Sequence, residues 1–174
     1  MAYFPLTPLD QRIWAHYKRC GVRSPGDITL FHWDKITRST VIHRPGPTNG
    51  FPTRKKYTVF LNSEKSLPDR RIEMAHEIGH AIQHVGFQSE LKEILRTKQE
   101  KQADYFSFYS LASSPLIWST VYGDHWGFSV SHLSSIFGVT DSFMEERLWL
   151  FKKEMQTIAP DLWRLKSSKY DWGS

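Results

Sequence analysis

The chain has 174 residues, of which 40% are hydrophobic and 24% are charged, and these shares exclude the composition of a disordered protein. The 23 basic and 18 acidic residues give a net charge of +5, which is too modest to identify a nucleic-acid-binding protein by charge alone. No run approaches the roughly 18 apolar residues of a membrane span. We therefore expect a globular protein that is not anchored in a membrane and is long enough to bury a sizeable core.

Cysteine usage and the first residues of the chain predict a cytoplasmic location. Cys20 is the single cysteine, so no internal disulfide can form. The opening sequence, MAYFPLTPLDQRIW, lacks the basic start and the long apolar run of a secretory signal.

The first third of the chain predicts one helix followed by strands. Residues 7–20 carry apolar side chains at helical spacing after a Thr-Pro start. The segments STVIHR (39–44) and KYTVFLN (56–62) are rich in β-forming residues and predict two paired strands, joined by a Pro- and Gly-rich loop. Residues 28–33 fit a third strand or a helix equally well.

The remainder of the chain predicts helices from about Ser66 onward. One helix covers the histidine-rich stretch 70–85, a second covers about 89–112, and two more lie within 127–155, broken at Gly138. Strands followed by helices indicate an α+β fold.

We expect a small antiparallel sheet packed on the histidine-bearing helix, followed by a helical C-terminal part with a helix-turn-helix-like segment. The expected organisation is a core over residues 1–125 and a C-terminal region, 126–174, that packs on it to form one compact unit.

The stretch RRIEMAHEIGHAIQHV, residues 70–85, places His76, His80 and His84 at steps of four. Residues four apart share a helix face, so His76 and His80 can direct their imidazoles at one metal ion. Glu77 points to the neighbouring side, where a carboxylate can take a proton from a metal-bound water. This HExxH pattern predicts two zinc ligands and a catalytic base. Histidines held in a core only by hydrogen bonds are the alternative, but the helix has an apolar side without them (Ile72, Ala75, Ile78, Ile82 and Val85).

A catalytic zinc ion takes three protein ligands, so a third donor is needed. His84 lies too far along the helix, about 12 Å from His76, and is expected to line the site or to support a ligand from behind. Glu100 and Asp104 form ExxxD on the next predicted helix, so Glu100 is the expected third ligand and Asp104 the partner of a ligating histidine. Two other carboxylates, Glu90 and Glu93, stand in a Lys-rich pattern typical of a solvated face. The group that would stabilise an oxyanion stays open among His125, Tyr105, Tyr109 and Tyr122.

Four stretches in this order resemble the ImmA/IrrE (M78) family of metallo-endopeptidases: YTVFLN, AHEIGHAIQH, EKQADYFS and LSSIFGVTDSFMEERL. HExxH followed by ExxxD is similar to the gluzincin arrangement of thermolysin-like peptidases, although Asp104 stands where the family often has Asn. The resemblance implies a cytoplasmic bacterial or phage metalloprotease with zinc, or manganese, bound by His76, His80 and Glu100, and with Glu77 as the base. It also implies a protein substrate, namely a helix-turn-helix repressor whose cleavage derepresses mobile-element, phage or stress genes.

Two other functions compete with this interpretation. The segment SSIFGVTDSFMEERL resembles a helix-turn-helix, which would suit a DNA-binding regulator. Against DNA binding, Glu145 and Glu146 would face phosphates poorly, and Arg147 stands where an apolar packing residue is expected. A protein that binds a repressor through a metal site without cutting it is the other alternative, but such a site has no need of the base Glu77.

Overall fold

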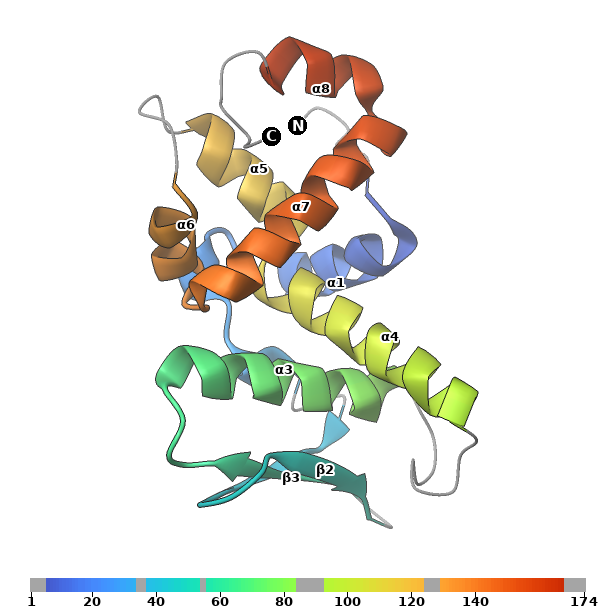
Figure 1. Ribbon diagram of the computed structural model, residues 1–174, viewed down its shortest axis with the longest axis vertical. Helices are drawn as coiled ribbons and strands as arrows, with labels where there is room; N and C mark the ends of the chain where they lie inside the picture. The colour runs from blue at the N-terminus through green and yellow to red at the C-terminus, as the bar shows by residue number, and fades with distance from the viewer. Residues whose placement is uncertain (1–5, 34–36, 54–55, 84–92, 124–128, 168–174) are drawn as a thin grey trace.

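The computed structural model describes residues 6–33, 37–53, 56–83, 93–123 and 129–167. A small sheet lies at one end of the molecule, helix α3 packs on it, and the other helices are stacked above (Figure 1). This arrangement confirms the predicted α+β class. The elements in chain order are α1 (Pro8–Arg19), η1 (Pro25–Asp27), η2 (Leu30–Trp33), β1 (Thr40–Arg44), β2 (Asn49–Pro52), β3 (Tyr57–Asn62), α3 (Leu67–Gln83), α4 (Glu93–Leu111), α5 (Ser114–Gly123), α6 (Val130–Phe137), α7 (Asp141–Ile158) and α8 (Pro160–Ser167).

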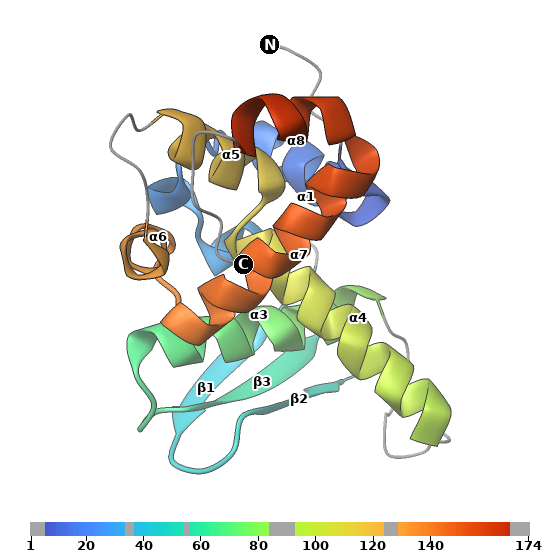
Figure 2. The same ribbon diagram turned by 45° about the horizontal axis from the view of Figure 1, so that its top comes forward.

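The three-stranded sheet is mixed rather than antiparallel, with β3 in the middle (Figure 2). β2 runs antiparallel to β3, as predicted for the sheet, but β1 runs parallel to β3, with Val41 opposite Val59. The difference arises because the segment expected to be a loop contains β2. This extra strand turns the chain once more, so β3 regains the direction of β1. The stretch 28–33 forms short 3-10 turns rather than a strand.

Helices α3 and α4 pack closely against each other above the sheet. Gly79 lies where the two backbones meet, because a Cβ at this position would stand 3.0 Å from Cα of Ala103 and 3.1 Å from its carbonyl oxygen. Farther along, Nε2 of Gln83 donates a hydrogen bond to the carbonyl oxygen of Gln102 at 3.0 Å. Two small residues thus bring the helices together, and a side-chain bond fixes one end of the contact.

The predicted break at Gly138 separates α6 from α7. Gly138 adopts φ 65°, a left-handed conformation that glycine accepts readily, and its amide bonds to the end of α6. Thr140 then caps α7 by accepting a hydrogen bond from the amide of Phe143. Pro115 opens a separate helix, α5, which separates α4 from this pair.

A cluster of ionisable and polar side chains lies inside the helical half of the molecule. It consists of Asp10, Tyr109, Ser114, Arg147 and Glu154, and we call it the Arg147 cluster. The side chain of Arg147 is 0% exposed. Its guanidinium donates to the carbonyl oxygen of Ala112 at 2.8 Å and to the hydroxyl of Ser114 at 2.7 Å, and lies 3.6 Å from Glu154. Asp10 accepts a hydrogen bond from the amide of Ser114 at 3.1 Å. The cluster therefore ties α1, α5 and α7 together.

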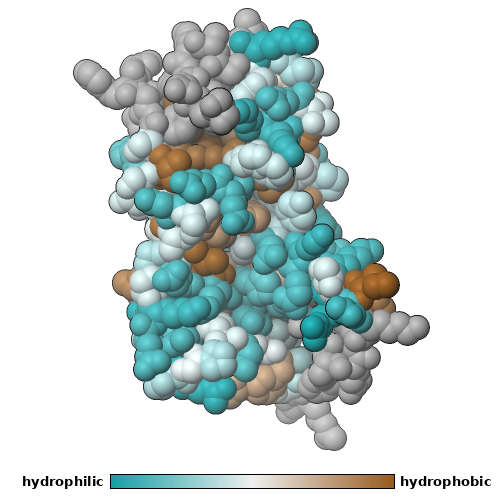
Figure 3. Space-filling model, viewed as in Figure 1, coloured by the Kyte–Doolittle hydropathy of each residue, from teal (hydrophilic) through white to brown (hydrophobic). Residues whose placement is uncertain are grey.

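Hydrophobic side chains are mostly buried, but a few remain on the surface. Ile94 and Leu95, at the start of α4, are 84% and 50% exposed. Figure 3 shows hydrophobic colour there and in a hollow at mid-height, where α7 meets α3 and α4. Within the described part of the chain, no helix is long and apolar enough to cross a membrane.

Candidate metal centre

Three side-chain atoms converge where α3 packs against α4. Nε2 of His76 lies 2.9 Å from Nε2 of His80 and 3.2 Å from Oε2 of Glu100, and Nε2 of His80 lies 3.5 Å from the same oxygen. The ligand atoms of a tetrahedral zinc ion, with bonds of about 2.0–2.1 Å, are separated by about 3.3 Å. The three atoms predicted as ligands from the sequence therefore lie at a spacing that fits such an ion.

Helix geometry accounts for this convergence. His76 and His80 are one helical turn apart on α3, and Glu100 reaches them from α4. The side chain of His80 is 6% exposed, that of His76 is 25% exposed, and that of Glu100 is 42% exposed. The group is thus closed on the His80 side and open to solvent beside Glu100.

Asp104 supports His76 from behind. Its carboxylate accepts a hydrogen bond from Nδ1 of His76 at 2.9 Å, which leaves Nε2 of that ring as the atom directed at Glu100 and His80. Burial alone would lower the pKa of His76, but the hydrogen bond from Asp104 and the charges of Asp104, Glu77 and Glu100 together raise it. The predicted contact between Asp104 and a candidate ligand is present.

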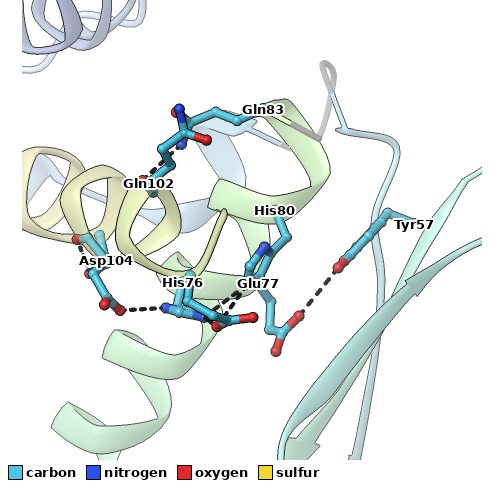
Figure 4. Close-up of polar contacts among 9 residues, drawn as sticks. Tyr57, His76, Glu77, His80, Gln83, Gln102 and Asp104 are labelled. Atoms are coloured by element: carbon cyan, nitrogen blue, oxygen red, sulfur yellow. Dashed lines mark hydrogen bonds and ion pairs between the residues drawn. The ribbon is translucent and has the colours of Figure 1, made fainter. Parts of the chain in front are cut away.

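Glu77 points away from this convergence and toward the sheet (Figure 4). The hydroxyl of Tyr57, on β3, donates a hydrogen bond to Oε2 of Glu77 at 3.3 Å. Burial raises the pKa of Glu77, while the charge of His76 and the hydrogen bond from Tyr57 act in the opposite direction and do not cancel this effect. Burial and the Glu77 carboxylate in turn raise the pKa of Tyr57, so its hydroxyl keeps its proton at neutral pH.

Gly50 brings the edge strand β2 against the same two side chains. A Cβ at this position would lie 2.5 Å from the Tyr57 ring and 2.7 Å from its hydroxyl, and also against Glu77. Only a residue without a side chain leaves Tyr57 and Glu77 in place here. Neither Gly50 nor Tyr57 was among the site residues predicted from the sequence. The signal for Tyr57 was its position at the start of a predicted strand; its contact with Glu77, 20 residues away, depends on how α3 packs on the sheet.

The other candidate residues lie apart from this group or outside the described residues. His84, expected to line the site or to support a ligand, and the carboxylate Glu90 both fall outside the described ranges. Glu93 is exposed at the start of α4. Among the candidates for an oxyanion-binding group, Tyr109 belongs to the Arg147 cluster, where it bonds to Glu154, and Tyr105 is 44% exposed on α4. The structure does not describe His125 or the side chain of Tyr122.

The chain is similar to a known protein family and to solved structures. A solved structure, described as a Mycobacterium tuberculosis transcriptional regulator, matches with a TM-score of 0.60 at 15% identity, over 83% of this chain and 47% of that one. At this identity the likeness shows a shared fold, and the chain spans about half the length of that structure. No curated protein matches the chain. The family model of the IrrE N-terminal-like domain, a metallopeptidase family (M78), matches residues 36–148 and so covers more than half of the chain, including β1 to β3, the three convergent side chains and the N-terminal part of α7. The chain therefore belongs to the IrrE N-terminal-like M78 peptidase family.

Proposed function

We propose that the chain is a zinc-dependent endopeptidase that cleaves a helix-turn-helix transcriptional repressor. One observation carries the peptidase assignment: Glu77 follows the candidate ligand His76 in α3, and its carboxylate accepts a hydrogen bond from Tyr57 on the side of the candidate metal centre that faces the sheet. A site that only binds a metal ion needs no carboxylate in the position of a base.

The donor set supports zinc, and manganese is the second choice. Two imidazole nitrogens and one carboxylate oxygen form a ligand set of the kind found in catalytic zinc sites. When bound, such an ion polarises the scissile carbonyl and lowers the pKa of a water molecule at its open position. Asp104 holds the His76 ring in the tautomer that presents Nε2.

Glu77 is the proposed base. Its carboxylate accepts the proton of the attacking water and then returns it to the leaving amine. Burial raises the pKa of Glu77 toward the pH at which the enzyme works. A carboxylate with such a pKa is better suited both to accept the proton of the water and to return it to the leaving amine. The hydrogen bond from Tyr57 fixes Oε2, so the other carboxylate oxygen is left to face the water.

The edge strand β2 offers a place for an extended substrate. β2 lies at one edge of the described sheet, and Gly50 on it contacts Glu77 and Tyr57. An extended peptide that adds to this edge by backbone hydrogen bonds would pass the base. YTVFLN forms the central strand of the sheet, so β2 is the edge that lies beside Glu77.

The proposed substrate and location follow from the family. The ImmA/IrrE resemblance implies repressor cleavage that derepresses mobile-element, phage or stress genes, and the matched Mycobacterium structure is itself described as a transcriptional regulator. We place the reaction in the cytoplasm, where DNA-bound repressors act.

Direct DNA binding is the weaker proposal. α6 and α7 are joined by a tight turn at Gly138, as in a helix-turn-helix. However, Arg147 is 0% exposed, whereas Glu145 and Glu146 are exposed on α7. A helix that presents carboxylates and buries its arginine is a poor partner for phosphates.

Glu77→Gln tests the proposed function. The variant, loaded with zinc, should cleave a purified helix-turn-helix repressor that the parent protein cuts about 100- to 10,000-fold more slowly than the parent protein does. Glu64→Gln is the matched control, because Glu64 is exposed in the turn after β3 and should leave the rate unchanged. Equal cleavage by the parent protein and the Glu77→Gln variant would overturn the peptidase proposal, and plasma emission analysis that finds no bound metal would overturn the ligand assignment.

A further inference from the structure

A groove runs from the metal centre across the helical half of the molecule. It consists of two adjoining hollows, of about 420 and 600 Å³. The first lies between α3, α4 and α7 and includes His76 and Asp104 in its wall. The second continues between α4 and α7, and the two hollows share Asp104, Phe108 and Glu146. Of the residues at the candidate metal centre, the lining includes His76 and its partner Asp104, so the groove begins beside one candidate ligand.

The groove wall on α4 is a continuous helical face. Lys101, Asp104, Tyr105 and Phe108 follow one another at spacings of three, one and three, so they share one side of the helix. The aromatic rings lie beyond Asp104, the residue that holds His76, so this face begins at the candidate metal centre and becomes apolar with distance from it.

The opposing wall on α7 has the same character. Glu145, Glu146, Trp149 and Leu150 share one side of that helix, and Trp149 is 58% exposed. Exposed aromatic side chains in a hollow are typical of surfaces that bind protein segments. Figure 3 shows hydrophobic colour in the hollow at the near end of the groove, where α7 meets α3 and α4.

The charge of the groove opposes that of the whole chain. Its lining contains five carboxylates and two lysines, a net of three negative charges, whereas the chain carries +5. One of the lysines, Lys65, is paired with Glu73. The side-chain carboxylates of Glu145 and Glu146 have no hydrogen-bond or ion-pair partner within the described ranges. The exposed carboxylates of Glu145 and Glu146 therefore lie beside the aromatic side chains that line the groove. The five carboxylates are those of Asp69, Glu73, Asp104, Glu145 and Glu146.

We propose that this groove binds a basic amphipathic segment of the protein substrate, next to the bond that is cut. Apolar side chains of the segment pack on Phe108 and Trp149, and its lysine or arginine side chains pair with Glu145 and Glu146. The groove therefore selects substrates by a region outside the scissile bond. The inference rests on the proposed peptidase function, because only a substrate has reason to continue from the metal centre. A second copy of this chain seated here would instead cover His76 and Asp104.

Peptide binding tests this inference separately from cleavage. The probes are two labelled 15-residue peptides with identical leucine and phenylalanine positions, one with lysines and the other with glutamates at the polar positions. The full-length Glu77→Gln protein, loaded with zinc, is titrated by fluorescence polarisation. We expect the basic peptide to bind at least about tenfold more tightly than the acidic one, with an affinity that falls as salt is added.

Two groove variants and a matched control locate the binding. Glu145→Lys/Glu146→Lys should weaken binding of the basic peptide about tenfold or more, and Trp149→Ala should weaken it with no change of charge. Glu93→Lys/Asp161→Lys makes the same change in net charge at exposed positions outside the groove, and should leave the affinity unchanged. All four substituted carboxylates are exposed, so the variants keep the fold.

Several results would overturn the groove proposal. Equal affinity for the two peptides would do so, because the charges of the groove would then play no part in binding. Equal loss in the control variant would do so as well, because the effect would then come from the overall charge of the protein. Self-association that the Glu145→Lys/Glu146→Lys change abolishes would assign the groove to a second copy. These results leave the effect of Glu77→Gln on cleavage untouched, whereas unchanged cleavage by Glu77→Gln removes the peptidase proposal and leaves the peptide-binding results standing.

Discussion

The candidate metal centre and the Arg147 cluster both join helices through ionisable side chains, yet they differ in how charges meet. In the Arg147 cluster a buried cation contacts Glu154, the Ala112 carbonyl and the Ser114 hydroxyl, so donors face acceptors. In the metal centre the Nε2 atoms of two imidazoles and Oε2 of Glu100, all of which can bind a metal ion through a lone pair, lie within 3.5 Å of one another. A cluster of donors and acceptors stabilises a fold by itself, whereas converging acceptors are stable together only with a proton or a cation between them.

Exposure separates the two clusters as well. Arg147 is 0% exposed, whereas Glu100 and Asp104 are 42% and 56% exposed. The Arg147 cluster should therefore control the free energy of unfolding, and the candidate metal centre should control metal affinity and reaction rate. Four variants, from the largest expected effect to the smallest, test this division.

Arg147→Met should lower the free energy of unfolding by about 3–5 kcal/mol, because it leaves the buried carboxylate of Asp10 and the partly buried carboxylate of Glu154 without their cation. Urea unfolding followed by circular dichroism measures the change. Arg164→Met, at an exposed side chain of α8, should change it by less than about 0.5 kcal/mol. A similar small change for both variants would show that Arg147 does not organise the helical half.

Asp10→Asn should remove a pH dependence of stability. Burial raises the pKa of Asp10 from 3.8 to about 6, in spite of the attraction of Arg147 and the hydrogen bonds from Ser114. Because the folded state binds this proton more tightly than the unfolded state, the group favours folding at low pH, and that contribution is lost as the pH rises through about 6. From pH 7 to pH 4 the parent protein should gain on the order of 3 kcal/mol relative to the variant. Unfolding curves whose difference stays constant over this range would contradict the expectation.

Asp104→Ala should weaken zinc binding about 10- to 100-fold, because Nδ1 of His76 loses the carboxylate that orients the ring. Competition with a chromogenic chelator measures the affinity. The stability of the metal-free protein should hardly change, since the Asp104 side chain is 56% exposed. Asp161→Ala, at an exposed carboxylate of α8, serves as the control, and equal zinc affinity in both variants would refute the role of Asp104.

Tyr57→Phe should have the smallest effect, a loss of about three- to tenfold in kcat/KM, which corresponds to about 1 kcal/mol for the loss of one long hydrogen bond. The hydrogen bond from Tyr57 lowers the pKa of Glu77, so its removal should raise that pKa. A base works only when deprotonated, and the acidic limb of the pH–rate profile should accordingly move to higher pH. Zinc content should stay the same. A profile that keeps its position would mean that Tyr57 does not act through Glu77.

How much of the fold and of the candidate metal centre could be predicted from the sequence depends on how far apart in the chain the contacting residues lie. His76, Glu77 and His80 are close in the chain, so helical spacing alone predicts their relative positions. Glu100 was predicted because ExxxD lies on the next helix, and the structure brings its carboxylate to both histidines.

The parts that were missed depend on contacts across the fold. Local patterns predicted that the two longer strands pair, but their parallel direction depends on β2, a four-residue strand within a segment that read as a loop. Tyr57 and Gly50 reach Glu77 only because α3 packs on the sheet next to this edge. The burial of Arg147 was equally unreadable, since its partners Asp10 and Ser114 come from distant parts of the chain.

The contact of Gly79 with Ala103 sets a dimension that no ligand sets by itself. Gly79 precedes His80 in the chain and Ala103 precedes Asp104, so the closest approach of the two backbones lies beside the convergent atoms. One added methyl group at Gly79 would press on the Ala103 backbone and on Cβ of Phe106, so α4, which also carries Glu100, would have to shift relative to α3. The close packing at Gly79, the glycine of HEIGH, therefore sets how near the two histidines of α3 lie to Glu100 of α4, and with it the space for an ion between the two helices.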